Sequence, residues 1–398
     1  MPPFPITRAE ISRSRLISNF ERLRSLAQGT PGADACELLA VVKANAYGHG
    51  LALCAPWLVD AGATWIGVTA VQEGVEARQL CPDASILVMR GMLPGEADAV
   101  LYARLAPAIW EREHLEALAK AAARRPCATG SVPVHLEIDT GMSRQGVALE
   151  DLAKLLGSLR DFPALRLDGV FTHLASPEVL DSQQNLQQMS CLEQASEQVQ
   201  AAGFSPKWLH AGNSSSVLGQ RTASSLAALG AKIGARWMMR PGLALYGYAL
   251  PFTRDGREGT SLPVDLTPVL SWKTAIASLR DVEAGTSVGY NATFVAPRKM
   301  RLALLPVGYA DGLNRKLSNR GHVLVRAVAA PIVGRVSMDL TAIDVTHIAG
   351  AKVGDEVAIL GEQNGLRVTA DDHARWAETI SYEILCAISA RVPRVAVP

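Results

Sequence analysis

Eight short apolar segments recur through the first 250 residues, and a stretch with helical spacing follows each of them. Apolar runs bounded by polar or turn residues are typical of buried strands. The stretches between them, such as residues 111–125 and 181–203, are rich in Ala, Leu and Glu. The predicted strands are residues 37–43, 64–69, 85–90, 106–110, 132–138, 165–173, 207–212 and 237–242. This repeated alternation predicts a (β/α)₈ barrel, with a doubly wound open sheet as the alternative.

After about residue 262 the sequence changes character. Short β-rich runs are punctuated at close intervals by Gly, Pro and Asp, which is typical of an all-β domain. A helical stretch at residues 371–389 then nearly closes the chain. Gly, Ser, Pro and charged residues cluster within residues 251–265. We therefore predict a barrel domain over residues 1–255 and a mainly β domain over residues 256–398.

Charge and composition exclude several classes of partner. The formal net charge is +1 and like charges form no long run, which argues against nucleic acid or an anionic membrane as the main partner. The first residues carry no basic start followed by an apolar run, so we expect no signal peptide and a cytoplasmic location. The six cysteines are scattered without a C-x-x-C pair, which predicts reduced thiols and no metal site.

Basic and polar residues gather at the C-terminal ends of the predicted strands. In a (β/α)₈ barrel these ends carry the active site. The set comprises Lys43, Glu137, Asp139, Arg144, Thr172, His173, His210, Asn213, Ser214, Ser215, Arg240 and Gly242. We therefore expect one lysine, two arginines, two histidines and a Gly/Ser-rich turn to converge on one face of the barrel.

Each of these residues, taken alone, also has a structural interpretation. A lysine at a strand end is commonly a solvated charge, and Arg240 could simply pair with a carboxylate. Their coincidence favours a pyridoxal phosphate site, because it combines an amine for the aldehyde, donors for the phosphate and cations for a ring nitrogen or carboxylate. The sequence lacks the G-x-x-x-x-G-K-[ST], H-E-x-x-H and G-x-S-x-G motifs and a strand-linked G-x-G-x-x-G, which argues against nucleotide, metalloprotease and serine hydrolase sites.

The segment AVVKANAYGHG, residues 40–50, resembles the cofactor-lysine motif of the alanine racemases. These enzymes combine a pyridoxal phosphate barrel with a C-terminal β domain. The segments HLEIDTGMSRQG, GVFTHLAS, HAGNSSS, RPGLALYG, SVGYNATF, PVGYADG, APIVGRVSMD and ISYEILCAISARVPR also occur in the family's order. The resemblance implies interconversion of L- and D-alanine, a supply of D-alanine for peptidoglycan, and an obligate homodimer with shared active sites.

The resemblance also implies roles for individual residues. Lys43 would bind the cofactor covalently and act as the base on one face of the substrate α-carbon, and Tyr290 of the other subunit would be the base on the opposite face. Arg144 and Met338 would bind the substrate carboxylate. The remaining cofactor contacts would come from Tyr47, Arg144, His173, Asn213, Ser214, Arg240, Gly242, Leu243 and Tyr382. The substrate access route and its inner gate would be lined by Tyr309, Arg315, Arg335 and Asp339.

This choice of residues suits racemisation. One α-proton must leave one face while another arrives on the opposite face, and two bases achieve this directly. Free Lys and Tyr titrate near ~10.4 and ~10, so both need neighbours that lower their pKa values. Arg240 would face the pyridine nitrogen, and a guanidinium does not give up its proton. The ring would therefore remain a weaker electron sink, which would suppress transamination and decarboxylation.

Glu137 departs from the family pattern. The family often has a lysine at this position, and that lysine carries a carbamate that orients the arginine matching Arg144. We expect the Glu137 carboxylate to pair with Arg144 and to replace the carbamate without carbon dioxide. Because residues near this arginine shape the pocket, the departure bears on substrate scope, and Ser337 is a second position of interest.

Three alternatives remain at this stage. The first is a broad-specificity amino-acid racemase, for which an exported protein would be expected. The second is a decarboxylase of the same architecture, which would need a carboxylate at the position of Arg240. The third is a non-catalytic pyridoxal phosphate carrier, but such barrels lack the β domain and Tyr290.

Overall fold

The computed structural model describes residues 5–29, 36–125, 129–260 and 265–398. These residues form two compact units. The barrel unit consists of the described residues within Leu16–Ala46 and Leu51–Leu266, and the β unit consists of those within Met1–Arg15, Tyr47–Gly50 and Thr267–Pro398. The predicted boundary at residues 255 and 256 lies in the turn between β10 (Phe252–Arg254) and β11 (Arg257–Thr260), and residues 261–264 of the predicted linker lie outside the described residues.

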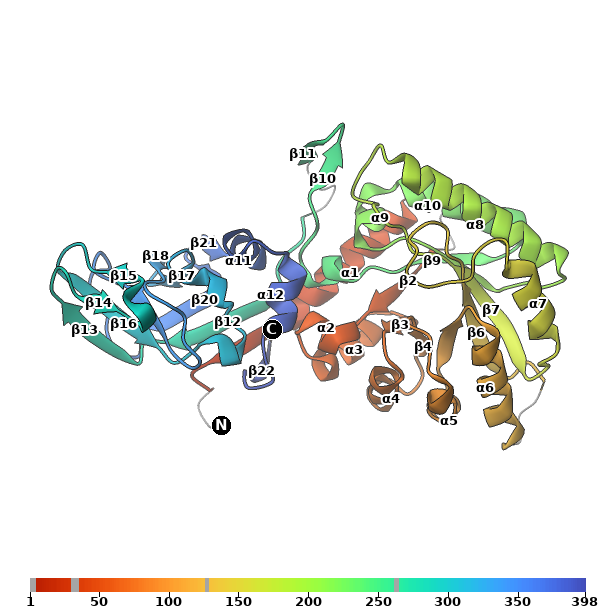
Figure 1. The fold of residues 1–398 in the computed structure, drawn as a ribbon, viewed down its shortest axis with the longest axis horizontal. Helices are drawn as coiled ribbons and strands as arrows, with labels where there is room; N and C mark the ends of the chain where they lie inside the picture. Colours follow the sequence, from red (N-terminus) through yellow and green to blue (C-terminus); the bar gives the residue numbers. More distant parts are fainter. Residues whose placement is uncertain (1–4, 30–35, 126–128, 261–264) are drawn as a thin grey trace. The chain divides into compact units, whose positions relative to one another are not determined.

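A closed barrel of parallel strands forms the centre of the barrel unit (Figure 1). Each predicted strand overlaps one observed strand, and β9 pairs with β2 to close the ring. The strands are β2 (Cys36–Val41), β3 (Trp65–Val68), β4 (Ser85–Val88), β5 (Ala106–Ile109), β6 (Val132–Glu137), β7 (Leu165–Phe171), β8 (Trp208–His210) and β9 (Arg236–Met239). The closure confirms the (β/α)₈ prediction and excludes the open-sheet alternative.

The longer helices of the barrel unit bury one face each. In α6 the buried residues Leu115, Leu118, Ala121 and Ala122 recur at the three- and four-residue spacing of a helix face. The helices are α1 (Arg13–Gln28), α3 (Leu51–Asp60), α4 (Val71–Leu80), α5 (Ala97–Tyr102), α6 (Arg112–Ala123), α7 (Leu152–Arg160), α8 (Gln183–Ala201), α9 (Ser214–Gly219) and α10 (Arg221–Ile233). No described helix is both long and apolar enough to cross a membrane.

The β unit is built around a seven-stranded sheet with the order β18-β17-β20-β12-β1-β22, to which β21 is added beside β20. Its strands are β1 (Arg8–Ser12), β12 (Leu270–Ala275), β17 (His322–Val325), β18 (Val328–Pro331), β20 (Glu356–Gln363), β21 (Leu366–Val368) and β22 (Arg394–Val397). A three-stranded sheet contains β13 (Ser278–Val282), β16 (Met300–Leu305) and β19 (Thr341–Asp344). The mainly β character predicted for the C-terminal part is confirmed.

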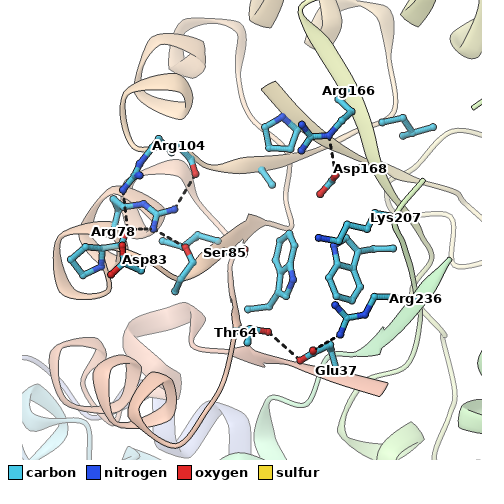
Figure 2. A pocket seen from close by; sticks show the side chains of 18 of the residues that line it. Glu37, Thr64, Arg78, Asp83, Ser85, Arg104, Arg166, Asp168, Lys207 and Arg236 are labelled. Carbon is cyan, nitrogen blue, oxygen red and sulfur yellow. Dashed lines mark hydrogen bonds and ion pairs between the residues drawn. The ribbon is translucent and has the colours of Figure 1, made fainter. Parts of the chain in front are cut away.

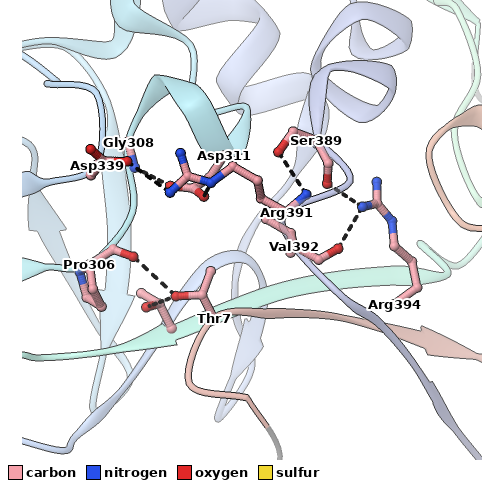
Figure 3. Close-up of polar contacts among 10 residues, drawn as sticks. Thr7, Pro306, Gly308, Asp311, Asp339, Ser389, Arg391, Val392 and Arg394 are labelled. Carbon is pink, nitrogen blue, oxygen red and sulfur yellow. Dashed lines mark hydrogen bonds and ion pairs between the residues drawn. The ribbon is translucent and has the colours of Figure 1, made fainter.

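The first strand of the chain belongs to the β unit. β1 runs antiparallel to β12 and parallel to β22, so both ends of the chain enter one sheet. The sheet is joined to nearby loops by polar contacts (Figure 3). Thr7 donates to the carbonyl of Pro306, and Arg394 donates to the carbonyls of Val392 at 2.7 Å and Gly48 at 2.9 Å. The hairpin of β14 (Ser287–Val288) and β15 (Phe294–Val295) and the helices α11 (Ala370–Ala377) and α12 (Ser381–Ala387) complete the unit.

Candidate active site

Lys43 lies two residues after the end of β2, at the C-terminal end of the barrel strands, as predicted. The backbone after it is unusual, because Ala44, Asn45, Ala46 and Tyr47 all have φ between 52° and 55°. Left-handed backbone costs a non-glycine residue roughly 1–2 kcal/mol, and such strain clusters at functional sites. Polar contacts hold the turn in this conformation: Ala44 donates its N–H to the Glu73 carboxylate at 2.7 Å, and the Asn45 side chain accepts from the N–H of Leu51.

Arg240 follows β9 at the same end of the barrel and is 4% exposed. Its guanidinium donates to the carbonyl of Thr172 at 2.7 Å, to Nδ1 of His210 at 3.1 Å and to Nδ1 of His173 at 3.3 Å. Burial lowers the pKa of Arg240 to about 10, a shift that the Arg144 charge increases and the Glu137 charge opposes. Arg240 therefore keeps its positive charge at neutral pH although its hydrogen-bond partners are neutral.

A second imidazole extends this contact into the barrel. Nε2 of His210 lies 2.8 Å from Nδ1 of His135. Because a guanidinium only donates, Nδ1 of His210 must accept, and its proton must then sit on Nε2 and point to His135. His135 consequently carries its own proton on Nε2, which is buried and has no partner among the described residues. The Arg240–His210–His135 chain is thus fixed in one set of tautomers.

Burial is the main reason why His135, His173 and His210 stay neutral. It lowers the pKa of His135 to about 4 and of His173 to about 3, and it moves the pKa of His210 well below its usual value. The positive charge of Arg240 acts in the same direction on each of them. Sequence reasoning missed His135, although it lies two residues before Glu137 on the same face of an otherwise apolar strand.

The start of α9 and the segment after β9 form a cradle rich in hydrogen-bonding groups. Asn213 caps α9 by accepting from the N–H groups of Ser215 and Ser216. The Ser214 hydroxyl accepts from the N–H of Gly242 at 3.0 Å and of Ala244 at 3.1 Å, which leaves its own proton for an anion. The structure thus brings Ser214 and Gly242 together, as predicted, and buries Leu243 beside them. This donor set fits a phosphate group.

A third cluster lies after β6. Glu137 is 2% exposed, and its carboxylate accepts a hydrogen bond from the side-chain amide of Gln145. Asp139 accepts from the N–H groups of Gly141, Met142 and Ser143, each at 3.0 Å, and so shapes the loop that carries Arg144. Among the described residues Arg144 forms no ion pair with Glu137, and the expected pairing stays a prediction. Sequence reasoning missed Gln145.

Burial raises the pKa of Glu137 to about 7. The hydrogen bond from Gln145 opposes this shift most strongly, followed by the positive charges of Arg240 and Arg144. The carboxylate is therefore harder to ionise than an exposed one, and the groups that favour its ionised form all lie at the C-terminal end of the barrel.

The other predicted site residues belong to the β unit. Tyr290 begins the single-turn helix η3 (Tyr290–Ala292) and is 69% exposed. The Tyr47 and Tyr382 rings lie 5.9 Å apart, and burial raises the pKa of the Tyr47 phenol, which therefore stays a neutral donor. The structure thus brings Tyr47 and Tyr382 together within this unit, while Lys43 and Arg240 lie in the barrel unit.

Tyr309, one of the predicted gate residues, takes part in a backbone contact between two loops of the β unit, and Arg335 and Asp339 lie within two residues of that contact in sequence. The N–H groups of Tyr309 and Ala310 donate to the carbonyls of Ser337 and Met338, each at 3.0 Å. A side chain at Gly308 would come within 2.3 Å of both carbonyl oxygens, so only glycine fits there. Asp339 pairs with Arg391 at 2.9 Å (Figure 3), Arg335 is half-buried, and Arg315 and Met338 are exposed.

Charged residues also surround a cavity of about 810 Å³ at the opposite, N-terminal end of the barrel strands. Figure 2 shows Arg236 reaching Glu37 and Arg166 reaching Asp168, at 2.6 and 3.0 Å. Arg78 donates to five carbonyls, including those of Ala84 and Arg104, near the ends of α4 and α5. Cations at helix C-termini offset the partial negative charge there, so we assign this cluster a structural role.

Both units match profiles of one protein family. The profile of the alanine racemase N-terminal domain matches residues 11–250, and the profile of the alanine racemase C-terminal domain matches residues 269–396. An alanine racemase of Geobacter sulfurreducens is 39% identical to this chain, over 98% of this chain and 96% of the relative. An alanine racemase of Symbiobacterium thermophilum is 38% identical over the same shares.

Solved structures of alanine racemases have the same fold as this chain. The alanine racemase of Bacillus anthracis with bound L-Ala-P has a TM-score of 0.86 at 28% identity, over 100% of this chain and 96% of that one. The alanine racemase of Bartonella henselae with covalently bound pyridoxal phosphate has a TM-score of 0.81 at 26% identity, over 99% and 100% of the two chains. Taken with the barrel, the β unit and the residues at the strand ends, these matches show that the chain belongs to the alanine racemase family of isomerases.

Proposed function

We propose that this chain interconverts L- and D-alanine with pyridoxal phosphate, and that Lys43 and Tyr290 act as bases on opposite faces of the substrate α-carbon. One observation carries the proposal: Lys43, at a strand end, and Arg240, which is buried and has only neutral hydrogen-bond partners among the described residues, lie at the same end of the barrel. A buried arginine without a bonded carboxylate is costly, and an acceptor on a cofactor ring would compensate it.

The residues present fit the cofactor. When bound, pyridoxal phosphate supplies an electron-withdrawing ring that acidifies the α-proton of an amino acid. Lys43 would hold its reactive carbon, while the Ser214 hydroxyl, the backbone at Gly242 and the hydroxyls of Tyr47 and Tyr382 would hold its phosphate. Arg240 would donate to the ring nitrogen. Arg240 keeps its proton beside the neutral imidazoles of His173 and His210, so the ring nitrogen would not be protonated.

The proposal includes a homodimer with shared sites and a role for D-alanine in peptidoglycan. Tyr290 is exposed on the β unit, which suits a residue that serves another subunit. The carboxylate of alanine would lie between Arg144 and the backbone of Met338. The alternative is a racemase of broad specificity, and turnover of larger amino acids would distinguish the two.

Polarimetry with purified protein, pyridoxal phosphate and L-alanine tests the activity, with L-serine, L-lysine and L-arginine in parallel. We expect fast conversion of alanine alone, and loss of that conversion in Lys43→Ala and Tyr290→Phe. Comparable turnover of lysine or arginine would favour the broad racemase. If no amino acid is racemised, the two-base proposal is wrong and a carrier role replaces it.

Mixing the two inactive variants tests the shared site. In a mixed dimer of Lys43→Ala and Tyr290→Phe, one site would combine both native residues, so refolded mixtures should regain about a quarter of native activity. The control is Lys43→Ala protein refolded alone by the same procedure. A mixture of the two variants that stays inactive despite forming dimers would contradict the sharing.

A further inference from the structure

Gln145 links three segments of the barrel unit. Its side-chain nitrogen donates to the carbonyl of Met89, just after β4, at 2.8 Å and also to the carboxylate of Glu137, the last residue of β6. Gln145 itself lies in the loop that carries Arg144. The contact therefore ties this loop to two neighbouring strand ends of the barrel.

The chemistry of the partners fixes the orientation of the amide. A backbone carbonyl only accepts hydrogen bonds, so the atom of Gln145 that faces Met89 must be the nitrogen. The same nitrogen faces Glu137 and has no lone pair to offer, so the nearer carboxylate oxygen must accept. A protonated oxygen at that position would be left without an acceptor. The contact therefore favours the ionised carboxylate in one orientation.

Charged groups around Glu137 make this orientation relevant to ligand binding. The groups acting on it are the cations Arg240, after β9, and Arg144, together with the anion Asp139 in the same loop. Arg240 is already bonded to Thr172, His173 and His210. Arg144 is exposed and is therefore the cation whose position the carboxylate can still determine.

We propose that Gln145 is a positioning residue for substrate binding: it fixes the Glu137 carboxylate, which in turn orients the Arg144 guanidinium toward the carboxylate of the substrate. The inference rests on the proposed function. It assigns Gln145 no contact with the substrate or the reacting atoms, so its effect must pass through Glu137.

The test compares Gln145→Met, which removes both hydrogen bonds at similar volume, with Gln145→Glu, which turns a carboxylate toward Glu137. Gln184→Met is the matched control, because Gln184 donates to the carbonyl of Gly141 in the same loop at 3.2 Å but does not contact Glu137. The holoenzyme of each variant is assayed for kcat and KM with L-alanine. Calorimetry gives the dissociation constant for propionate, which has a carboxylate but no amine.

We expect Gln145→Met to raise KM and the propionate dissociation constant about tenfold, which corresponds to ~1.4 kcal/mol, with kcat within about threefold of native. Gln145→Glu should raise KM and the propionate dissociation constant further. When KM is measured against pH, the midpoint of its change should move to higher pH, because a second carboxylate opposes ionisation of Glu137. Gln184→Met should leave both constants unchanged. Equal effects of Gln145→Met and Gln184→Met would reduce Gln145 to a loop anchor and overturn the proposal.

A double-mutant cycle tests the route through Glu137. If Gln145 acts only through that carboxylate, Gln145→Met should add little to the effect of Glu137→Gln on propionate binding. If the effects of Gln145→Met and Glu137→Gln on propionate binding are fully additive, Gln145 does not act through Glu137. Propionate binding does not require turnover, so these outcomes stay distinct from failure of the racemase proposal, which polarimetry of the native protein would reveal.

Discussion

The two ends of the barrel use the same residue types in opposite ways, and β9 shows this most directly. Arg236 begins the strand, is exposed and pairs with Glu37 at 2.6 Å, whereas Arg240 follows the strand, is buried and donates, within the described part of the chain, to a carbonyl and two neutral imidazoles. Two lysines differ in exposure in the same sense: Lys207 is exposed before β8, and Lys43 is half-buried after β2. Position along a parallel strand, rather than residue type, therefore separates structural cations from those available to a ligand.

Electrostatics explains why the contrast matters. A cation that already has a carboxylate partner in water interacts weakly with anything else. A cation buried among neutral donors and acceptors keeps an unbalanced charge, and an acceptor brought by a ligand can balance it. The C-terminal end of the barrel is thus prepared for a ligand, while at the N-terminal end Arg166 and Arg236 already have carboxylate partners.

The largest difference is expected between the replacements of Lys43 and Lys207. Lys43→Ala should lower kcat for alanine by about 10³-fold or more, because it removes the proposed base and the group proposed to hold the cofactor. Lys207→Ala, at the opposite end, should leave kcat unchanged. Steady-state polarimetry checks both variants, and similar losses in the two would remove the distinction between the barrel ends.

The two arginines of β9 should differ nearly as much. Arg240→Gln should lower kcat by about 10²-fold and the free energy of unfolding by about 2–4 kcal/mol, because the Thr172 carbonyl and the His210 ring lose a charged partner. Urea unfolding and racemase assays measure the two quantities. Retained activity in a folded Arg240→Gln protein would contradict the role given to this guanidinium.

Glu137 should make stability depend on pH. Its pKa is raised in the folded state from 4.5 to about 7, so the folded protein holds this proton more tightly than the unfolded chain does. Stability should therefore fall as pH rises between these values, by roughly 3 kcal/mol for this group. Unfolding in urea at pH 5 and pH 8 should show this loss in the native protein and a smaller one in Glu137→Gln, and identical pH dependence would refute the assignment.

The smallest effect is expected at the N-terminal end. Glu37→Gln breaks the partly exposed pair with Arg236, and such pairs contribute about 0.2–1 kcal/mol. The free energy of unfolding should change within that range and kcat should not change. A loss of activity in this variant would show that the N-terminal cavity takes part in the reaction.

Much of the barrel could be predicted because its determinants are local. Parallel strands buried on both faces read as continuous apolar runs, as in β4, and their C-terminal ends converge in any such barrel. Lys43, His173 and Arg240 could therefore be placed on one face before their distances were known.

Long-range partners could not be predicted in this way. The pairing of β1 with β12 and β22 joins segments more than 250 residues apart in sequence, and no local pattern in β1 encodes it. His135 and Gln145 were missed for the same reason, because their partners His210 and Met89 lie on other strands or just after them. The expected pairing of Glu137 with Arg144 depends on how an exposed side chain is oriented, which sequence patterns do not determine.

The most direct test asks which lysine holds the cofactor. The native protein is incubated with pyridoxal phosphate and reduced with borohydride, and peptide mass mapping then locates the modification. Our account predicts one stoichiometric modification, on the peptide that contains Lys43, with Lys207 unmodified. Stoichiometric modification of Lys207 or another lysine, with Lys43 intact, would contradict the assignment of the chemistry to the C-terminal end of the barrel.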